Sequence, residues 1–332
     1  MKNFLIYIFV VLLFLSACSG DVIKESQNKE VVVYTSVDQH IAEEILNDFE
    51  NETGIKVLPV YDIEASKTTG LANRLISEKD NPQGDVFWSS EIIMTLKLKE
   101  EGVFQPYKSE EARNIPKSYK DNEGYWTGFG GRARVMIVNK NILGNEKYPN
   151  SVYDLTNEEY KDYKKAVAYP MFGTTLTHLY VMSQNWSIDE AVQYFVDAQE
   201  NNTLIVDGNS VVRDLVASGE VAFGITDTDD AFAAVKDGKP VEVIYLDQDG
   251  IGTLVIPNTV GLINQCTNTE EGKIFIDYIL KKETEDKLIK MGFIDISLNN
   301  DKKDLEFLEC DFQMAYENND ELLEEIQNAL VR

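Results

Sequence analysis

The 332-residue chain is poor in the residues that usually mark catalytic or metal centres, with only two histidines and three cysteines. No cysteine lies near His40 or His178 at metal-ligand spacing, so we do not expect a structural zinc site. No nucleophile elbow, zinc-protease motif, Cys–His pair or phosphate-binding loop occurs in the sequence. We therefore expect a protein that is not an enzyme.

Positive charge is also scarce, since 31 Lys and Arg face 57 Asp and Glu and the formal net charge is −26. Surfaces that bind nucleic acid or anionic lipid need clustered basic side chains, which argues against both kinds of partner. The hydrophobic fraction of 43% supports a sizeable core, and the length suits two domains.

The first residues have the features of an export signal. Lys2 precedes an apolar run over residues 4–15 that is short for a membrane span, and Leu-Ser-Ala-Cys follows at residues 15–18. This ending resembles the bacterial lipobox, which implies cleavage after residue 17, a lipid on Cys18 and a polar tether over residues 18–29. An ordinary secretory signal is the alternative. Cys266 and Cys310 then remain, and the sequence leaves their pairing open.

Beyond the tether, strand and helix patterns alternate. A β-branched run at residues 31–36 precedes a helical face with Ile41, Ile45 and Phe49, and further strands are expected at 55–60 and 84–88. This rhythm predicts βαβ units, a parallel sheet and polar strand ends on one edge. A Gly-rich segment at 125–131 indicates a crossing between two lobes.

Three segments combine Gly, hydroxyl or amide residues with strand-to-helix turns. Free N–H groups at helix starts, with hydroxyls and an arginine nearby, form a natural cradle for phosphate, carbonate or carboxylate. Each segment alone is weak evidence for an anion-binding site, because the same residue types are common helix caps. The predicted ligand- or anion-binding residues are Ser36, Gly131, Arg132, Gly173, Thr174, Thr175, Asn209 and Ser210.

An acidic set accompanies these segments, and its centre is the stretch FGITDTDDA at residues 223–231. Converging carboxylates can hold a hard metal ion or an ammonium group. The predicted metal or ammonium ligands are Asp38, Glu91, Asp227 and Asp229. Capping of the following helix is the competing interpretation, and it fits Asp230 best.

The order of these motifs resembles the substrate-binding lipoproteins of ABC importers, in particular the ferric-iron-binding branch of the bacterial extracellular solute-binding proteins. The residues that carry the resemblance are the lipobox, VVVYTSVDQHIAEEILNDFENETGIKV, GDVFWSSE, YWTGFGGRARVMIVN, FGTT, DGNSVVRDLVASGEVAFGITDTDDA and GTLVIPNTVGLI. The resemblance implies an α/β fold with two lobes, the type II-like periplasmic-binding-protein fold. Its mixed or parallel sheets are flanked by helices, and the ligand lies in the interlobe cleft.

The expected organisation is lobe 1 at residues 30–127 plus 243–295, lobe 2 at 128–242 and a C-terminal helical segment at 296–332. The family's anion-binding segments match Gly131-Arg132, Gly173-Thr174 and Asn209-Ser210. Ferric binders of this kind usually have a Tyr-Tyr pair where this chain has Thr228-Asp229, and often a His where it has Asp38.

Two ligand classes follow. The first is iron, or another hard cation, bound with a synergistic small anion; the second is a small phosphorylated, phosphonate or zwitterionic organic solute. Either way, we expect an exported monomer anchored through lipidated Cys18 that serves an ABC permease and ATPase encoded elsewhere. A secreted hydrolase using Asp227 and Glu91 as acid and base would need a water-excluding site and turnover, so we do not favour it. A purely structural protein is also disfavoured, because a structural role gives no reason for polar groups to gather at strand ends.

Overall fold

The computed structural model describes residues 29–62, 69–299, 304–317 and 320–330. The predicted signal peptide, most of the tether and Cys18 lie outside the described residues. Within the described part, no helix combines the length and apolar character needed to cross a membrane. Cys266 and Cys310 are both free thiols and do not form the disulfide that the sequence left open.

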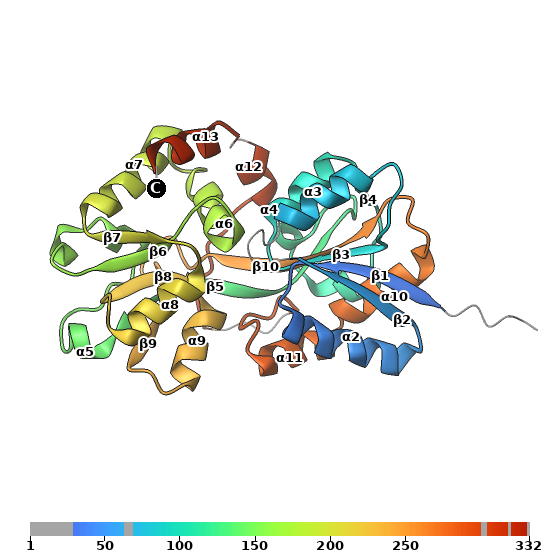
Figure 1. Ribbon diagram of the computed structural model, residues 1–332, viewed down its shortest axis with the longest axis horizontal. Helices are drawn as coiled ribbons and strands as arrows, with labels where there is room; N and C mark the ends of the chain where they lie inside the picture. Colours follow the sequence, from blue (N-terminus) through green and yellow to red (C-terminus); the bar gives the residue numbers. More distant parts are fainter. Residues whose placement is uncertain (1–28, 63–68, 300–303, 318–319, 331–332) are drawn as a thin grey trace, which may run out of the picture.

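Lobe 1 is built on a mixed sheet. Strands β1 (Glu30–Thr35), β2 (Lys56–Tyr61) and β3 (Val86–Ser89) run parallel, and β10 (Val255–Ile263) pairs antiparallel with β3, β4 (Phe104–Gln105) and β5 (Thr127–Asn139). Figure 1 shows helices on both faces of this sheet. They are α2 (Gln39–Thr53), α3 (Thr69–Glu78), α4 (Ile93–Glu100), α10 (Thr269–Leu280) and α11 (Lys282–Met291).

Lobe 2 uses a second sheet. β6 (Lys165–Ala168) runs parallel to β7 (Thr203–Val206) and β8 (Phe223–Asp227), while β8 and β9 (Val241–Tyr245) flank β5 in antiparallel pairing. In Figure 1, α6 and α7 lie on one side of this sheet and α8 and α9 on the other. The bounds are α5 (Lys140–Leu143), α6 (Gly173–Met182), α7 (Ile188–Glu200), α8 (Asn209–Ser218) and α9 (Thr228–Lys236). Short 3₁₀ helices occur at Glu110–Asn114, Lys117–Tyr119, Val152–Leu155 and Glu158–Tyr160.

The two lobes share strand β5, whose 13 residues are all buried. Its first half pairs with β10 and its second half with β8 and β9, so one continuous strand belongs to both sheets. The register with β10 shifts at Pro257/Asn258, opposite Gly130, which has a φ of 42°. Such a bulge bends the strand where it leaves one sheet for the other. The predicted crossing and the predicted two-lobed α/β architecture are confirmed (Figure 1).

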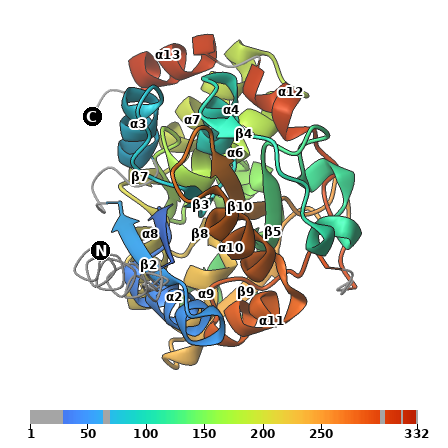
Figure 2. The same ribbon diagram turned by 90° about the vertical axis from the view of Figure 1, so that its right-hand side faces the viewer.

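Two details differ from the expected organisation. β9 pairs with β5 in the second sheet, so residues 243–245 belong structurally to lobe 2 although the sequence placed them in lobe 1. At the C-terminus, α12 (Phe312–Glu317) packs against α4 and α6, whereas α13 (Asp320–Ala329) packs against α7. Figure 2, which views the molecule from lobe 1, shows both helices at one end of it. The remaining lobe boundaries stay a prediction.

Helix α2 illustrates how the pattern produces the packing. Ile41, Ile45 and Phe49 lie one turn apart and are buried, as their spacing predicts. The helix ends at Gly54, whose φ of 70° is the left-handed cap conformation that glycine adopts without strain. The ring of Phe49 meets that of Phe275 from α10 edge to face, with 5.1 Å between centroids.

The packing of β8 against its neighbours leaves no room for a side chain at Gly224. A Cβ at this position would overlap the carbonyl oxygen of Ala166 and approach Cγ1 of Val212 to 2.6 Å. We expect Gly224→Ala to lower the free energy of unfolding by about 1–3 kcal/mol, because backbone must move to accept the methyl group. Urea denaturation measures the loss. Gly250→Ala is the control, since its Cβ would meet only Asp247 O at 3.7 Å; equal losses in the two variants would contradict the prediction.

Candidate ligand-binding site

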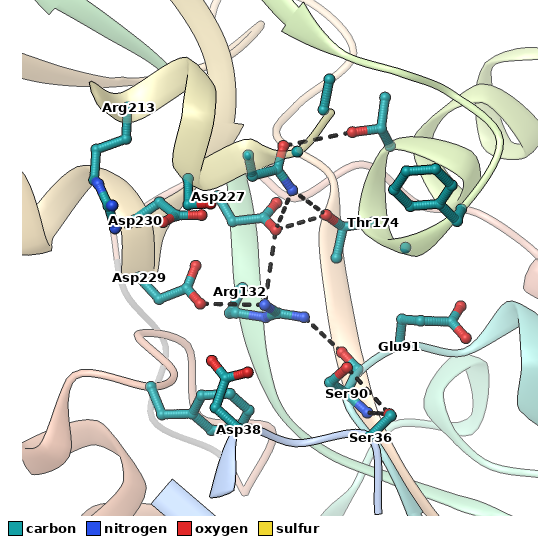
Figure 3. A pocket seen from close by; sticks show the side chains of 18 of the residues that line it. Ser36, Asp38, Ser90, Glu91, Arg132, Thr174, Arg213, Asp227, Asp229 and Asp230 are labelled. Carbon is teal, nitrogen blue, oxygen red and sulfur yellow. Dashed lines mark hydrogen bonds and ion pairs between the residues drawn. The ribbon is translucent and has the colours of Figure 1, made fainter. Parts of the chain in front are cut away.

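A polar pocket of about 260 Å³ lies between the lobes (Figure 3). Ser36, Asp38, Ser90, Glu91 and Phe293 reach it from lobe 1, and Arg132 enters from the shared strand β5. Lobe 2 contributes Ala168, Phe172, Gly173, Thr174, Thr175, Asp207, Gly208, Asn209, Ser210, Arg213, Asp227, Asp229 and Asp230. The predicted strand-end positions therefore converge on one site, as the parallel topology requires.

Three helices begin at this pocket without a side-chain cap. The residues before α6, α8 and α9 are Phe172, Gly208 and Asp227, and none of their side chains bonds the first N–H groups. The positive ends of the helix dipoles and their unused donors therefore face the pocket. Such helix starts are the usual backbone device for binding an anion.

Beneath the pocket, a buried ion pair joins β5 to β8. Nη1 of Arg134 donates to Oδ1 of Asp227 at 2.6 Å, and both side chains are almost completely shielded from water. The other oxygen of Asp227 accepts from Thr174 Oγ1 at 2.6 Å and from Asn209 Nδ2 at 3.0 Å. Burial disfavours the charged form, but Arg134 and then Arg132 outweigh it and hold the pKa of Asp227 below its usual range.

This pairing changes the role expected for Asp227. The residue occupies the cap position of α9, yet its carboxylate bonds Arg134, Thr174 and Asn209 instead of the helix start. Both of its oxygens accept hydrogen bonds from protein groups, so Asp227 orients the pocket walls. His178 joins the same cluster, because its Nδ1 accepts from Nε of Arg134 at 3.4 Å. Burial and the charge of Arg134 lower the pKa of His178 to about 3, so this imidazole is neutral.

Arg132 connects the lobes across the pocket floor. Its Nη2 donates to the carbonyl oxygen of Ser90 in lobe 1 at 2.6 Å, and its Nη1 donates to Oδ2 of Asp229 in lobe 2 at 3.2 Å. The guanidinium also lies 5.6 Å from the ring centre of Phe293. Although burial opposes the charged form, Asp229 and Asp227 raise the pKa of Arg132 above its ordinary value.

Glu91 is occupied in a similar way. Its carboxylate accepts from the N–H groups of Ile93 and Met94 at 2.5 and 3.0 Å, which caps α4, and from Thr177 of lobe 2 at 3.3 Å. Burial outweighs these bonds and raises its pKa to about 7. Glu91 therefore caps α4 and contacts lobe 2 through Thr177, and its role as a metal or ammonium ligand stays a prediction.

Two carboxylates of α9 complete the site. Asp230 accepts from Arg213 Nη1 at 2.9 Å, and burial together with the charges of Asp229 and Asp227 raises its pKa to about 7. Burial also raises the pKa of Asp229 despite the opposing charge of Arg132. Figure 3 shows Asp229, Asp230 and Arg213 on one side of Arg132 and Thr174, Ser90 and Ser36 on the other. The pocket thus has an Asp–Arg side and a hydroxyl side.

All predicted site residues within the described chain line this pocket except Gly131. Its N–H donates to Ile296 O at 2.7 Å, so this group is unavailable to an anion. The reason is that Gly131 bridges to the segment after α11, a pairing that no local pattern reveals. In the part of the chain that the structure describes, no three His, Cys, Asp or Glu side chains are grouped to hold a metal ion. The roles of Asp38, Glu91, Asp227 and Asp229 as metal or ammonium ligands stay a prediction.

Sequence reasoning missed several pocket residues. Arg213 follows Asn209 and Ser210 by one helical turn, and this spacing could have placed it on the same face of α8. Ser90 adjoins Glu91 at the end of β3. Nothing local signals Phe172 or Phe293.

Two α/β lobes joined by a shared strand, with a polar pocket at the strand ends, define the class of two-lobed solute-binding proteins. The chain belongs to the bacterial extracellular solute-binding protein family, whose model matches residues 84–312. It is similar to Iron uptake protein A1 of Synechocystis sp., with 26% identity over 78% of this chain and 73% of that protein. A putative 2-aminoethylphosphonate-binding periplasmic protein of Salmonella typhi is 23% identical over 67% of this chain and 65% of that protein.

Solved structures show the same fold. The ferric binding protein from Campylobacter jejuni superposes with a TM-score of 0.80 at 22% identity, covering 91% of this chain and 100% of that one. The periplasmic binding protein AfuA from Actinobacillus pleuropneumoniae, with fructose 6-phosphate bound, gives a TM-score of 0.77 at 21% identity, covering 91% and 98%. The predicted periplasmic-binding-protein fold is confirmed, and the family's members are binding proteins rather than enzymes.

The ion pair beneath the pocket yields a stability prediction. Asp227→Ala leaves Arg134 charged and buried without its partner, so we expect the free energy of unfolding to fall by about 3–5 kcal/mol. The control is Asp214→Ala, which removes an exposed partner of Arg213 and is expected to cost less than about 1 kcal/mol. Urea denaturation compares the two variants, and losses of similar size would contradict a special role for the buried pair.

Glu91 yields a pH prediction. Between its ordinary value of 4.5 and the folded value of about 7, the unfolded chain has lost the Glu91 proton while the native protein keeps it. Rising pH through this window therefore favours unfolding, by up to about 3 kcal/mol in total. Glu91→Gln removes this dependence, so the variant should gain stability relative to wild type between pH 4 and pH 8. Urea denaturation of ligand-free protein at both pH values measures it; a constant difference would refute the assignment.

Proposed function

We propose that this protein is the receptor of an ABC importer for a small organic solute that carries an anionic group, such as a phosphate ester or a phosphonate. The proposal rests on one observation above all. Three helix starts without side-chain caps face a single pocket, and four of its carboxylates are bonded to arginines, hydroxyls or backbone N–H groups, namely those of Glu91, Asp227, Asp229 and Asp230. Such a pocket offers donors to an incoming anion while its own acids are held in place.

The hydroxyl side of the pocket supports an anion there. Thr174 and Thr175 open α6, and Asn209 and Ser210 open α8. Ser36 and Ser90 face them from lobe 1, and Oγ of Ser36 accepts from the N–H of Ser90 at 3.0 Å. A phosphoryl group here would meet hydroxyl donors from both lobes, so its binding would favour a closed arrangement of the lobes.

A second candidate is iron bound together with a small anion, and the names of two relatives favour it. The protein from Synechocystis sp. is named for iron uptake, and the Campylobacter jejuni protein is named ferric binding. The residues of this chain support it less. Thr228-Asp229 replaces the phenolate pair, Thr228 donates to Asp295, and Asp227 and Glu91 are fully engaged. A hard cation held by Asp229 would lie beside the guanidinium of Arg132, which would repel it.

The same proposal covers transport. A permease and an ATPase would receive the solute, as the name of a relative in Sinorhizobium fredii, a probable ABC transporter periplasmic-binding protein, supports. We further propose that a lipid on Cys18 anchors the exported chain and that residues 18–29 tether the folded body to the membrane. Metabolic labelling with a radioactive fatty acid would detect the lipid, and its persistence in Cys18→Ala would refute the anchor.

Ligand identity is tested by mass spectrometry of what remains bound through purification, followed by calorimetry on protein that has been unfolded, stripped and refolded. We expect heat with phosphate esters or phosphonates, and a loss of about tenfold or more in affinity in Ser210→Ala, whose hydroxyl lies at the start of α8 and lines the pocket. Ser218→Ala, at the exposed far end of the same helix, is the matched control. Binding of ferric citrate alone would refute the proposal and support the second candidate.

A further inference from the structure

One carboxylate oxygen in the pocket has no hydrogen-bond donor. Oδ2 of Asp229 accepts from Arg132, but its Oδ1 is shielded from water and has no partner among the residues that the structure describes. Buried acceptors in native proteins are nearly always paired, so an unpaired one next to a binding pocket calls for a partner that enters from outside. Figure 3 shows this carboxylate directed from α9 toward Arg132 at the middle of the pocket.

The other acids next to it do not offer such an oxygen. Both oxygens of Asp227 and both oxygens of Glu91 accept hydrogen bonds from protein groups. Asp230 is paired with Arg213. Among the acids of α9, the buried oxygen without a hydrogen-bond donor is therefore Oδ1 of Asp229.

The surroundings of Asp229 select the kind of donor. Nε of Arg132 is a buried donor that also lacks a partner within the described chain. The guanidiniums of Arg132 and Arg213 line this side of the pocket and already pair with Asp229 and Asp230, so an ammonium group here would lie beside two positive charges and compete with them for these carboxylates. A phosphate would be repelled by Asp229. A hydroxyl both donates and accepts without charge, so it suits an unpaired carboxylate oxygen beside an unpaired N–H.

We propose that Asp229 is a specificity-determining residue that accepts a hydrogen bond from a ligand hydroxyl, so that the solute is a hydroxylated phosphate ester or phosphonate and not an aminoalkyl one. This inference rests on the proposed function, since it assigns the end of the ligand that lies opposite the anion. Phe172, which lines the pocket and is 39% exposed, offers an apolar face to the carbon skeleton between the two ends.

Two phosphonates of equal size test the inference, namely 2-hydroxyethylphosphonate and 2-aminoethylphosphonate, with inorganic phosphate as the probe of the anion end alone. In calorimetry on wild-type protein we expect the hydroxyl compound to bind more tightly than the amino compound. In Asp229→Ala its affinity should fall by about tenfold or more, while the affinity for inorganic phosphate changes by less than about threefold. Asp229→Asn keeps the shape and one acceptor, so its loss should be smaller.

The matched control is Asp237→Asn, which removes a carboxylate at the exposed far end of the same helix and should leave all three affinities unchanged. Thermal unfolding of each variant confirms that it is folded. Tighter binding of the amino compound, no loss in Asp229→Ala, or an equal loss for inorganic phosphate would overturn the role of Asp229 while leaving the proposed function intact. If wild type binds none of the three compounds but binds ferric citrate, the proposed function fails as well.

Discussion

The buried pair between Arg134 and Asp227 is the interaction on which the pocket depends. The two residues face each other across β5 and β8, and the same carboxylate holds Thr174 of α6 and Asn209 of α8. Four elements are therefore fixed around one charge pair. Two ions out of water carry a large desolvation cost, which is offset only when the remaining donors and acceptors are satisfied, as they are here. The starts of α6 and α8 stay open to a ligand because Asp227 neutralises Arg134 below them.

Strand β5 turns this local arrangement into one that involves both lobes. Arg132 and Arg134 are two residues apart, so both project from the same face. Arg134 pairs with Asp227 within lobe 2. Arg132 instead donates to the carbonyl oxygen of Ser90 in lobe 1 and to Asp229 in lobe 2. The bulge at Gly130 lies just before them, where β5 bends between the sheets. A change in lobe angle would therefore alter the Arg132 contacts first, which couples pocket occupancy to lobe position.

The sequence predicted where the site lies better than what each residue does there. Strand ends can be located in a sequence from hydrophobic runs and the turns that follow them, and parallel topology brings these ends together. For this reason Ser36, Thr174, Asn209 and Asp229, which were selected as strand-end residues, all line one pocket. The role of a residue could not be predicted from the sequence where that role depends on pairing between strands far apart in the chain. Asp227 had the spacing of a ligand or a cap, but its partner lies 93 residues away on β5. Gly131 does not offer its N–H to the pocket, because this group donates to the carbonyl oxygen of Ile296, in a segment that follows α11.

The net charge of −26 does not exclude an anionic solute, and the local geometry of the pocket explains why. Charges beyond about 10 Å are screened at ordinary ionic strength, so a ligand responds mainly to the groups that line its pocket. In the pocket Arg132 pairs with Asp229 and Arg213 with Asp230, Arg134 pairs with Asp227 beneath it, and burial keeps Glu91 and Asp230 partly protonated near neutral pH. These pairs reduce the negative charge that a ligand meets, so the arrangement of donors and acceptors decides which solute fits. The acidic surface then acts on solubility and encounter rate rather than on selection within the pocket.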